Sequence, residues 1–457
     1  MGRADPIDTI FDLSYAVRQM RTAILFAAVL TVSAADRKAS IDALVQPAID
    51  TQTVPGVVVG VLEDGKTQIF AYGKVAPDSV FEIGSITKTF TTTALALMVD
   101  RKMVALEDPV RKYLPPEAVP AGEGQEIRLI DLATQSSGLP RMPNNFHPKD
   151  PTNPYVDYTP QLLYEFLAKQ SLKLKPNAGF LYSNLGMGLL GHALSLRYGK
   201  SYEAMITELV ASPLGMNDTR VTLTADMQKR LAPGHDADGK PVHNWDLDAL
   251  AGAGALRSSA ADMLRYVQGH LDPPEKLKPA IELAHVKRAE VGGGTSIALA
   301  WLIKPDGKTY WHNGGTGGYS AYASFNTERK TGVVVLINGF GSLMDQIGDR
   351  VEHVLAGDKV EPLPLHRAIT LDSKTLDDYV GTYEIVTTVR FTVTRKGDQL
   401  FGQLTGQDPI GIYPEAKDKF FVRLVPASVD FERTGDGAVT GMVLHQNGRD
   451  TKAKKVQ

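Results

Sequence analysis

Phe81-Glu-Ile-Gly-Ser85-Ile-Thr-Lys88-Thr-Phe90 is the most informative segment of the chain. Its Gly-Ser pair precedes an apolar run that predicts a helix over 86–100, so Ser85 lies in the first turn and Lys88 shares its helix face. A helix N-terminus favours developing negative charge, and a lysine of lowered pKa can activate a serine hydroxyl. The spacing indicates a serine nucleophile with its base, although a serine at a helix start is more often only a cap.

Strand patterns flank this helix at both ends of a long region. Two of them enclose the turn Glu63-Asp64-Gly65, and helical patterns fill the middle. The predicted strands cover 57–62, 67–72, 309–312, 321–325 and 332–337, and the further predicted helices cover 159–170, 185–197 and 260–271. Strands from both ends around a helical middle predict an antiparallel sheet with segregated helices, the α+β class. Residues 141–158 predict a long surface loop, of the kind that often forms a lid or a binding wall.

The chain divides into four parts. Residues 1–35 predict a leader, 36–356 the α+β domain, 357–370 a linker that contains Pro362 and Pro364, and 371–457 a small β-barrel or sandwich. In the last part, residues 389–394 alternate strictly between apolar and polar, and similar short strands follow between good hairpin turns.

Composition narrows the function. The 457 residues carry a formal charge of -3 and no cysteine, which excludes thiolate catalysis, disulfides and cysteine metal sites and gives no sign of a nucleic-acid partner. In the leader, Arg18 and Arg21 precede the apolar run 23–32, and Ser33 and Ala35 fit a signal-peptide cleavage site. Met20 offers a simpler start for this signal, and a buried N-terminal helix is the alternative interpretation. We expect a secreted, periplasmic protein with no membrane span after processing.

Two more segments carry candidate chemistry. Tyr182 and Asn184 lie two residues apart in a loop before an apolar helix, so both can face one cleft, although a core tyrosine with a capping asparagine is the plainer interpretation. Tyr310-Trp-His312-Asn313-Gly314-Gly315-Thr-Gly-Gly318 places dense glycines at a strand edge, which lets a substrate pair there as an added strand. The Gly315 N–H is then a natural oxyanion donor, and a tight hairpin without a ligand is the alternative.

Together, the three segments resemble the Ser-x-x-Lys, Tyr-x-Asn and Lys/His-x-Gly motifs of the class C β-lactamase and DD-peptidase family, in order and in approximate separation. Segments 129–140, 212–216 and 252–258 resemble further landmarks of that family, and the resemblance covers roughly 40–355. It implies an antiparallel sheet beside an all-helical region, with the site between them. It also implies that Ser85 is the acylated nucleophile, that Lys88 and Tyr182 transfer protons, and that the Ser85 and Gly315 amides form the oxyanion hole. Asn184, His312, Asn313 and Gly314 would bind substrate.

The chain departs from the family at two positions. His312 stands where true class C β-lactamases usually carry lysine, whose fixed charge helps to bind a substrate carboxylate; an unperturbed histidine is charged only near pH 6.5 or below. Gln135 stands where relatives commonly have histidine, and we expect a structural role there. The C-terminal part resembles a lipocalin-like barrel appended to many of these hydrolases, which either restricts substrates or only stabilises or oligomerises the protein.

The predicted function is therefore that of a serine hydrolase acting through an acyl-enzyme on D-alanyl peptides, β-lactams or both. It needs no metal or organic cofactor. The alternatives are a carboxylesterase of the same family and, in another class, a penicillin-binding protein that does not hydrolyse its ligand. Expected partners are small-molecule or peptide substrates, and the sequence does not define an oligomeric state.

Overall fold

The computed structural model describes residues 34–118, 126–169, 179–407, 409–423, 425, 427–446 and 448–456. The leader prediction, with its alternative start at Met20, therefore lies outside the described residues except for Ala34 and Ala35. These two residues begin helix α2 (Ala34–Asp50), which the sequence interpretation did not anticipate.

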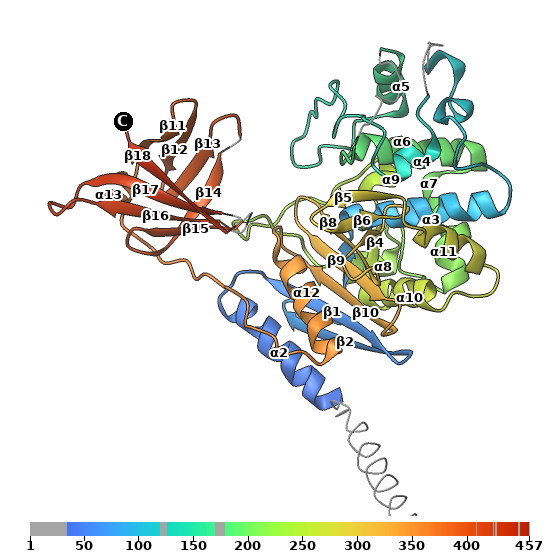
Figure 1. Cartoon of the computed structure of the whole chain (residues 1–457), viewed down its shortest axis with the longest axis horizontal. Helices are drawn as coiled ribbons and strands as arrows, with labels where there is room; N and C mark the ends of the chain where they lie inside the picture. Colours follow the sequence, from blue (N-terminus) through green and yellow to red (C-terminus); the bar gives the residue numbers. More distant parts are fainter. Residues whose placement is uncertain are drawn as a thin grey trace, which may run out of the picture.

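Within the described part of the chain, one eight-stranded antiparallel sheet organises the first region (Figure 1). Its order is β2-β1-β10-β9-β8-β7-β6-β5, so β1 from the start of the region pairs with β10 from its end, for example where Val59 faces Val335. The strands are β1 (Gly56–Glu63), β2 (Lys66–Gly73), β5 (Ala289–Gly292), β6 (Thr295–Ile297), β7 (Leu302–Ile303), β8 (Thr309–Gly315), β9 (Ser320–Asn326) and β10 (Thr331–Ile337). A separate pair joins β3 (Val80–Glu82) to β4 (Arg257–Ser259). The predicted α+β class is confirmed.

Both faces of the sheet are covered by helices. On β1, Val57, Val59 and Val61 pack into the apolar cluster that contains residues of α2 and α12, whereas Val58 and Leu62 pack into the larger cluster on the other face. This division follows from the two-residue period of a strand. Figure 1 shows α12 and α2 on one side of the sheet and most of the other helices on the other side.

Short caps set the boundaries of the helices near the site. Ser183 accepts a hydrogen bond from Gly186 N at the start of α6, and Gly199 ends that helix with a left-handed backbone. The helices after α2 are α3 (Thr87–Asp100), α4 (Leu129–Ala133), α5 (Pro160–Ala168), α6 (Asn184–Tyr198), α7 (Tyr202–Ile206), α8 (Ala225–Arg230), α9 (Ala251–Gly254), α10 (Ala260–Leu271), α11 (Lys278–His285), α12 (Leu343–Ala356) and α13 (Ser373–Asp377), with short turns η1 (Gly84–Ile86), η2 (Val110–Tyr113), η3 (Pro116–Ala118), η4 (Thr207–Ala211) and η5 (Ser212–Leu214).

The C-terminal strands form a closed barrel, β11 to β18 in sequence order, which stands to one side of the sheet in Figure 1. Tyr383 on β11 pairs with Lys455 on β18 and so closes it. Its strands are β11 (Gly381–Val386), β12 (Val389–Lys396), β13 (Gln399–Leu404), β14 (Ile410–Ala416), β15 (Lys419–Val422), β16 (Ala427–Arg433), β17 (Val439–Gln446) and β18 (Arg449–Lys455). Of the two predicted forms, barrel or sandwich, the structure has the barrel.

Candidate active site

The turn that carries Ser85 is fixed by backbone contacts with β8. Gly84 has φ +49, and a Cβ built on it would lie 2.7 Å from Gly315 N. A Cβ on Gly314 would lie 2.0 Å from Ile83 O. Only residues without a side chain allow η1 and β8 to approach this closely. The sequence spacing placed Ser85 at a helix start, and the structure adds that its turn lies directly against the Gly314–Gly315 segment.

Lys88 is buried on the first turn of α3, beneath Ser85. Its Nζ lies 2.9 Å from Ser85 Oγ and donates to the carbonyl of Ala253, in α9, at 2.6 Å. Burial lowers the pKa of Lys88 and the charge of Arg141 lowers it further, while Tyr182 acts in the opposite direction. An amine with a lowered pKa, held at hydrogen-bond distance from a hydroxyl, can accept its proton.

Tyr182 approaches the same hydroxyl from the loop before α6. Its OH donates to Ser85 Oγ at 2.6 Å, and Lys88 Nζ lies 4.9 Å from its ring centroid. Lys88 from the same helix start and Tyr182 from a distant part of the chain therefore both contact the oxygen of Ser85. This arrangement suits transfer of a proton away from Ser85 and back to a leaving group.

Gln135 holds the segment around Tyr182 in place. Its backbone carbonyl accepts from Leu181 N at 2.8 Å, and its side-chain oxygen accepts from Ser183 N at 2.7 Å. Gln135 is buried and has φ +57. Gln135 thus has the structural role expected of it. Sequence reasoning missed that this role is to hold the neighbours of Tyr182, a candidate catalytic residue.

Glu82, just before this turn, is a second residue that sequence reasoning missed. It accepts hydrogen bonds from Asn244 Nδ2 (3.0 Å), Trp245 N (2.9 Å) and Arg257 (3.2 Å) in a buried network. Burial raises the pKa of Glu82, and the guanidinium of Arg257 opposes the rise. The network fixes β3, from which the Ser85 turn departs.

Asn184 lies beside Tyr182, at the first residue of α6. Its backbone N donates to Arg141 O at 3.0 Å, and its Nδ2 lies 3.9 Å from Met142 Sδ. The 141–158 loop therefore forms a wall of the site, in keeping with the kind of loop predicted there. Arg141 is another residue that sequence reasoning did not single out.

The β8 segment opposite presents a free edge. β7 pairs with β8 only at Trp311 and Tyr310, so residues 312–315 have β9 on one side and no β7 partner on the other. An extended chain can add to such an edge through backbone hydrogen bonds. Gly315 ends β8 and is exposed, with its N beside Gly84.

The side chains of His312 and Asn313 point to opposite faces of the sheet. Asn313 donates to both oxygens of Asp345, on α12, at 2.9 Å, so its side chain is on the other face of the sheet from His312. Successive residues of a strand point to opposite faces, which explains the difference. Any contact of Asn313 with a substrate on the β8 edge is therefore made by its backbone, and its part in substrate binding stays a prediction.

His312 does not have the environment of an unperturbed histidine. Its side chain is buried, and its Nδ1 lies 2.6 Å from Asn313 O. Burial, together with the charge of Lys88, lowers the pKa of His312 to about 4. The imidazole is therefore neutral near pH 6.5, where an unperturbed histidine would be half protonated, and it supplies no positive charge at neutral pH.

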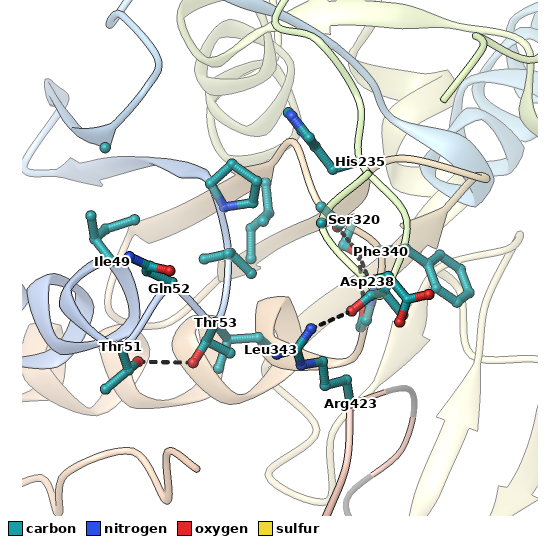
Figure 2. A pocket seen from close by; sticks show the side chains of 18 of the residues that line it. Ile49, Thr51, Gln52, Thr53, His235, Asp238, Ser320, Phe340, Leu343 and Arg423 are labelled. Atoms are coloured by element: carbon teal, nitrogen blue, oxygen red, sulfur yellow. Dashed lines mark hydrogen bonds between the residues drawn. The ribbon is translucent and has the colours of Figure 1, made fainter. Parts of the chain in front are cut away.

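The barrel docks next to the β8–β9 turn through polar contacts. Tyr413 OH donates to Asp238, and Arg423 donates to Ala237 O at 3.1 Å. The same loop contacts the turn, because His235 N donates to Gly318 O at 3.1 Å. A cavity of about 710 Å³ lies at this junction. Figure 2 shows Arg423 reaching from the barrel toward the loop that carries Asp238, with Ser320 and Phe340 close to that loop.

Neither a metal centre nor a membrane span is found in the described part of the chain. Among the residues described, no group of three or more His, Cys, Asp or Glu side chains is placed to hold a metal ion. No helix in the same residues is both long and apolar enough to cross a membrane.

Comparison with known families gives two matches that together span most of the chain. The model of the family described as Beta-lactamase matches residues 41–358, and that of a domain of unknown function, DUF3471, matches residues 365–455.

Named relatives agree with the first match. D-alanyl-D-alanine-carboxypeptidase/endopeptidase AmpH of Escherichia coli is 30% identical, over 66% of this chain and 86% of its own length. A beta-lactamase of Pseudomonas fluorescens is 28% identical, over 67% and 94%. Penicillin-binding protein 4* of Bacillus subtilis is 26% identical, over 83% and 88%. The crystal structure of D-alanine carboxypeptidase AmpC from Burkholderia cenocepacia has the same fold, with a TM-score of 0.60 and 24% identity over 71% of this chain and 99% of that one.

Proposed function

Because this chain belongs to the Beta-lactamase family of serine hydrolases, we propose that it hydrolyses D-alanyl peptides, β-lactams or both through an acyl-enzyme on Ser85. One observation carries the proposal: Ser85 Oγ lies 2.6 Å from the Tyr182 hydroxyl and 2.9 Å from Lys88 Nζ, in a turn packed against Gly314 and Gly315. Relatives named as beta-lactamases and as a D-alanyl-D-alanine carboxypeptidase support the substrate class.

The mechanism has two steps. Ser85 Oγ attacks the carbonyl carbon while its proton passes to Lys88 or Tyr182, and the oxyanion accepts hydrogen bonds from the N–H groups of Ser85 and Gly315. The carbon–nitrogen or carbon–oxygen bond then breaks, and the leaving group takes the proton. Water adds to the acyl-enzyme by the same route and releases the acid together with free Ser85.

The substrate lies between α6 and β8 in this proposal. Its backbone pairs with the free edge of residues 312–315, and Asn184 donates to a substrate carbonyl from the opposite wall. Gly314 contributes by its lack of a side chain, Asn313 through its backbone, and His312 as a neutral group.

A carboxylesterase of the same family is the second candidate, and one observation favours it. His312 is buried and neutral, so β8 lacks the fixed charge that would bind a substrate carboxylate. A neutral ester makes no demand on that charge. Both candidates use the same groups around Ser85.

Intact mass after mixing with penicillin, together with hydrolysis of nitrocefin, a D-Ala-D-Ala peptide and p-nitrophenyl butyrate, tests the proposal. We expect a penicilloyl adduct and turnover of the peptide or of nitrocefin. Brisk ester cleavage without an adduct would move the function to the esterase. An adduct that never turns over would identify a penicillin-binding protein without hydrolysis, and no adduct and no turnover would refute the proposal.

The remaining parts of the proposal concern organisation. We propose an α+β hydrolase domain at 36–356, a linker at 357–370 and a lipocalin-like barrel domain at 371–457. The apolar run 23–32 after Arg18 and Arg21 supports export to the periplasm.

A further inference from the structure

Arg141 leans over the ring of Tyr182 from the wall opposite β8. Its guanidinium carbon lies 5.1 Å from the ring centroid. Its carbonyl accepts from Asn184 N and Leu185 N at 3.0 and 3.2 Å, so its backbone is fixed to the first turn of α6. The side chain is exposed while its backbone is fixed. Its positive charge therefore lies next to the Tyr182 ring, whose hydroxyl contacts Ser85.

This charge has no acidic partner among the described residues. The ion pairs found there include many surface arginines but not Arg141. Lys88, the other cation at the site, is fully buried and bonded to Ser85 and Ala253, and His312 is neutral at pH 7. A fixed positive charge is therefore available to a substrate on the α6 wall and not on β8.

Two of the groups near Arg141 are hydrogen-bond donors that lie against a thioether sulfur. Tyr155 OH and Asn184 Nδ2 each lie 3.9 Å from Met142 Sδ, and a thioether is a poor acceptor. The Asn184 amide also faces the Tyr155 oxygen. Burial raises the pKa of Tyr155, and the positive charge of Arg141 opposes this rise. A guanidinium, an amide and a phenol on one wall match the oxygens of a carboxylate, which accepts several hydrogen bonds at once.

We propose that Arg141, assisted by Asn184 and Tyr155, binds a carboxylate on the acyl portion of the substrate and so determines specificity. Arg141 lies on the α6 side of Ser85, whereas position 312 lies on β8. The substrate carboxylate bound by Arg141 is therefore a different group from one that a lysine at position 312 would bind. The inference rests on the proposed function and adds the substrate class: acyl donors that carry an anionic arm.

A matched pair of esters tests this. Mono-(4-nitrophenyl) glutarate and 4-nitrophenyl butyrate share a leaving group and differ chiefly in the carboxylate on the acyl arm. The measurement is the ratio of kcat/KM for the anionic ester to that for the neutral ester. We expect Arg141→Gln to lower this ratio about tenfold, which corresponds to the loss of one charge-assisted hydrogen bond. Arg141→Lys should keep most of it, because it keeps the charge.

Two controls separate the Arg141 charge from the general charge of the loop. Lys149→Gln removes an exposed charge from the same loop, one for which no contact with the Tyr182 ring is found in the described part of the chain, and should leave the ratio unchanged. Raising salt from low to high should lower the ratio for the native protein more than for Arg141→Gln, since salt screens an exposed charge. An unchanged ratio in a folded Arg141→Gln variant, or an equal fall in Lys149→Gln, would overturn the inference. If the native protein cleaves neither ester and forms no penicillin adduct, the proposed function fails first and the inference with it.

Discussion

Substituting Gly314 by alanine tests whether the close contact between η1 and β8 assembles the site. The new Cβ would lie 2.0 Å from Ile83 O and 2.8 Å from Ser85 N, whereas ordinary contacts begin near 3.4 Å. Relief of the first contact alone requires a relative movement of about 1.4 Å, which is 3.4 minus 2.0. That movement separates the backbone N–H groups of Ser85 and Gly315, which are the two proposed oxyanion donors.

The expected cost follows from this displacement. A misplacement of about 1 Å in a catalytic group can lower the rate about 10²-fold, and loss of one oxyanion donor costs about 10²–10³. We therefore expect Gly314→Ala to lower kcat by at least about 10²-fold on nitrocefin or the nitrophenyl ester. Acylation by penicillin, followed by intact mass over time, measures the first step separately.

Gly254→Ala is the matched control. Gly254 also lies near this turn, but a Cβ there would have 3.5 Å to Leu247 and 3.7 Å to Gly84, so it has room. Its activity should stay within a few-fold of the native protein. If Gly314→Ala acylates as fast as Gly254→Ala, with both variants folded by circular dichroism, the reasoning about the contact is wrong.

Three other outcomes are expected. Ser85→Ala should abolish acylation while leaving the melting temperature within a few degrees of the native value, and retained turnover would remove Ser85 as nucleophile. His312→Lys should shift preference toward carboxylate-bearing substrates above neutral pH by supplying a fixed charge, and an unchanged ratio of nitrocefin to neutral ester would count against this. Burial holds the pKa values of His312 and His285 at about 4, below their ordinary 6.5, so the unfolded chain binds more protons between these values. The free energy of unfolding should then fall as pH is lowered from about 6.5 to 4, by up to about 1.4 kcal/mol per pH unit for each histidine; urea titrations at pH 7.5 and 5 measure this, and His285→Phe should reduce the slope.

Local patterns predicted the long elements well. Residues 260–271 form α10 as expected, and the predicted helix at 185–197 is α6 with one residue added at each end. These segments combine an apolar pattern with a serine cap, so local sequence and packing agree. The two- to four-residue strands β5, β6 and β7 are too short for an alternation to be visible, and the sequence interpretation missed them.

The site was predictable only in part. The three-residue spacing of Ser85 and Lys88 on one helix face is visible in the sequence, and the structure places their side chains 2.9 Å apart. The approach of Tyr182 across 97 positions is invisible to spacing, and only the family resemblance suggested it. The opposite directions of His312 and Asn313 follow from strand alternation, a signal that was present but not used. Arg141 carries no such signal, because its place over Tyr182 depends on the fold of a loop.

The docking of the barrel has a mechanical consequence. Polar contacts beside an open cavity, unlike a large apolar interface, permit the barrel to move relative to the region that carries Ser85. The contacts through Tyr413 and Arg423 both end on the loop at 235–241. That loop in turn is bonded to Gly318, in the turn that follows β8. A force on the barrel is therefore transmitted through this loop to the turn after β8, the strand that ends at Gly315.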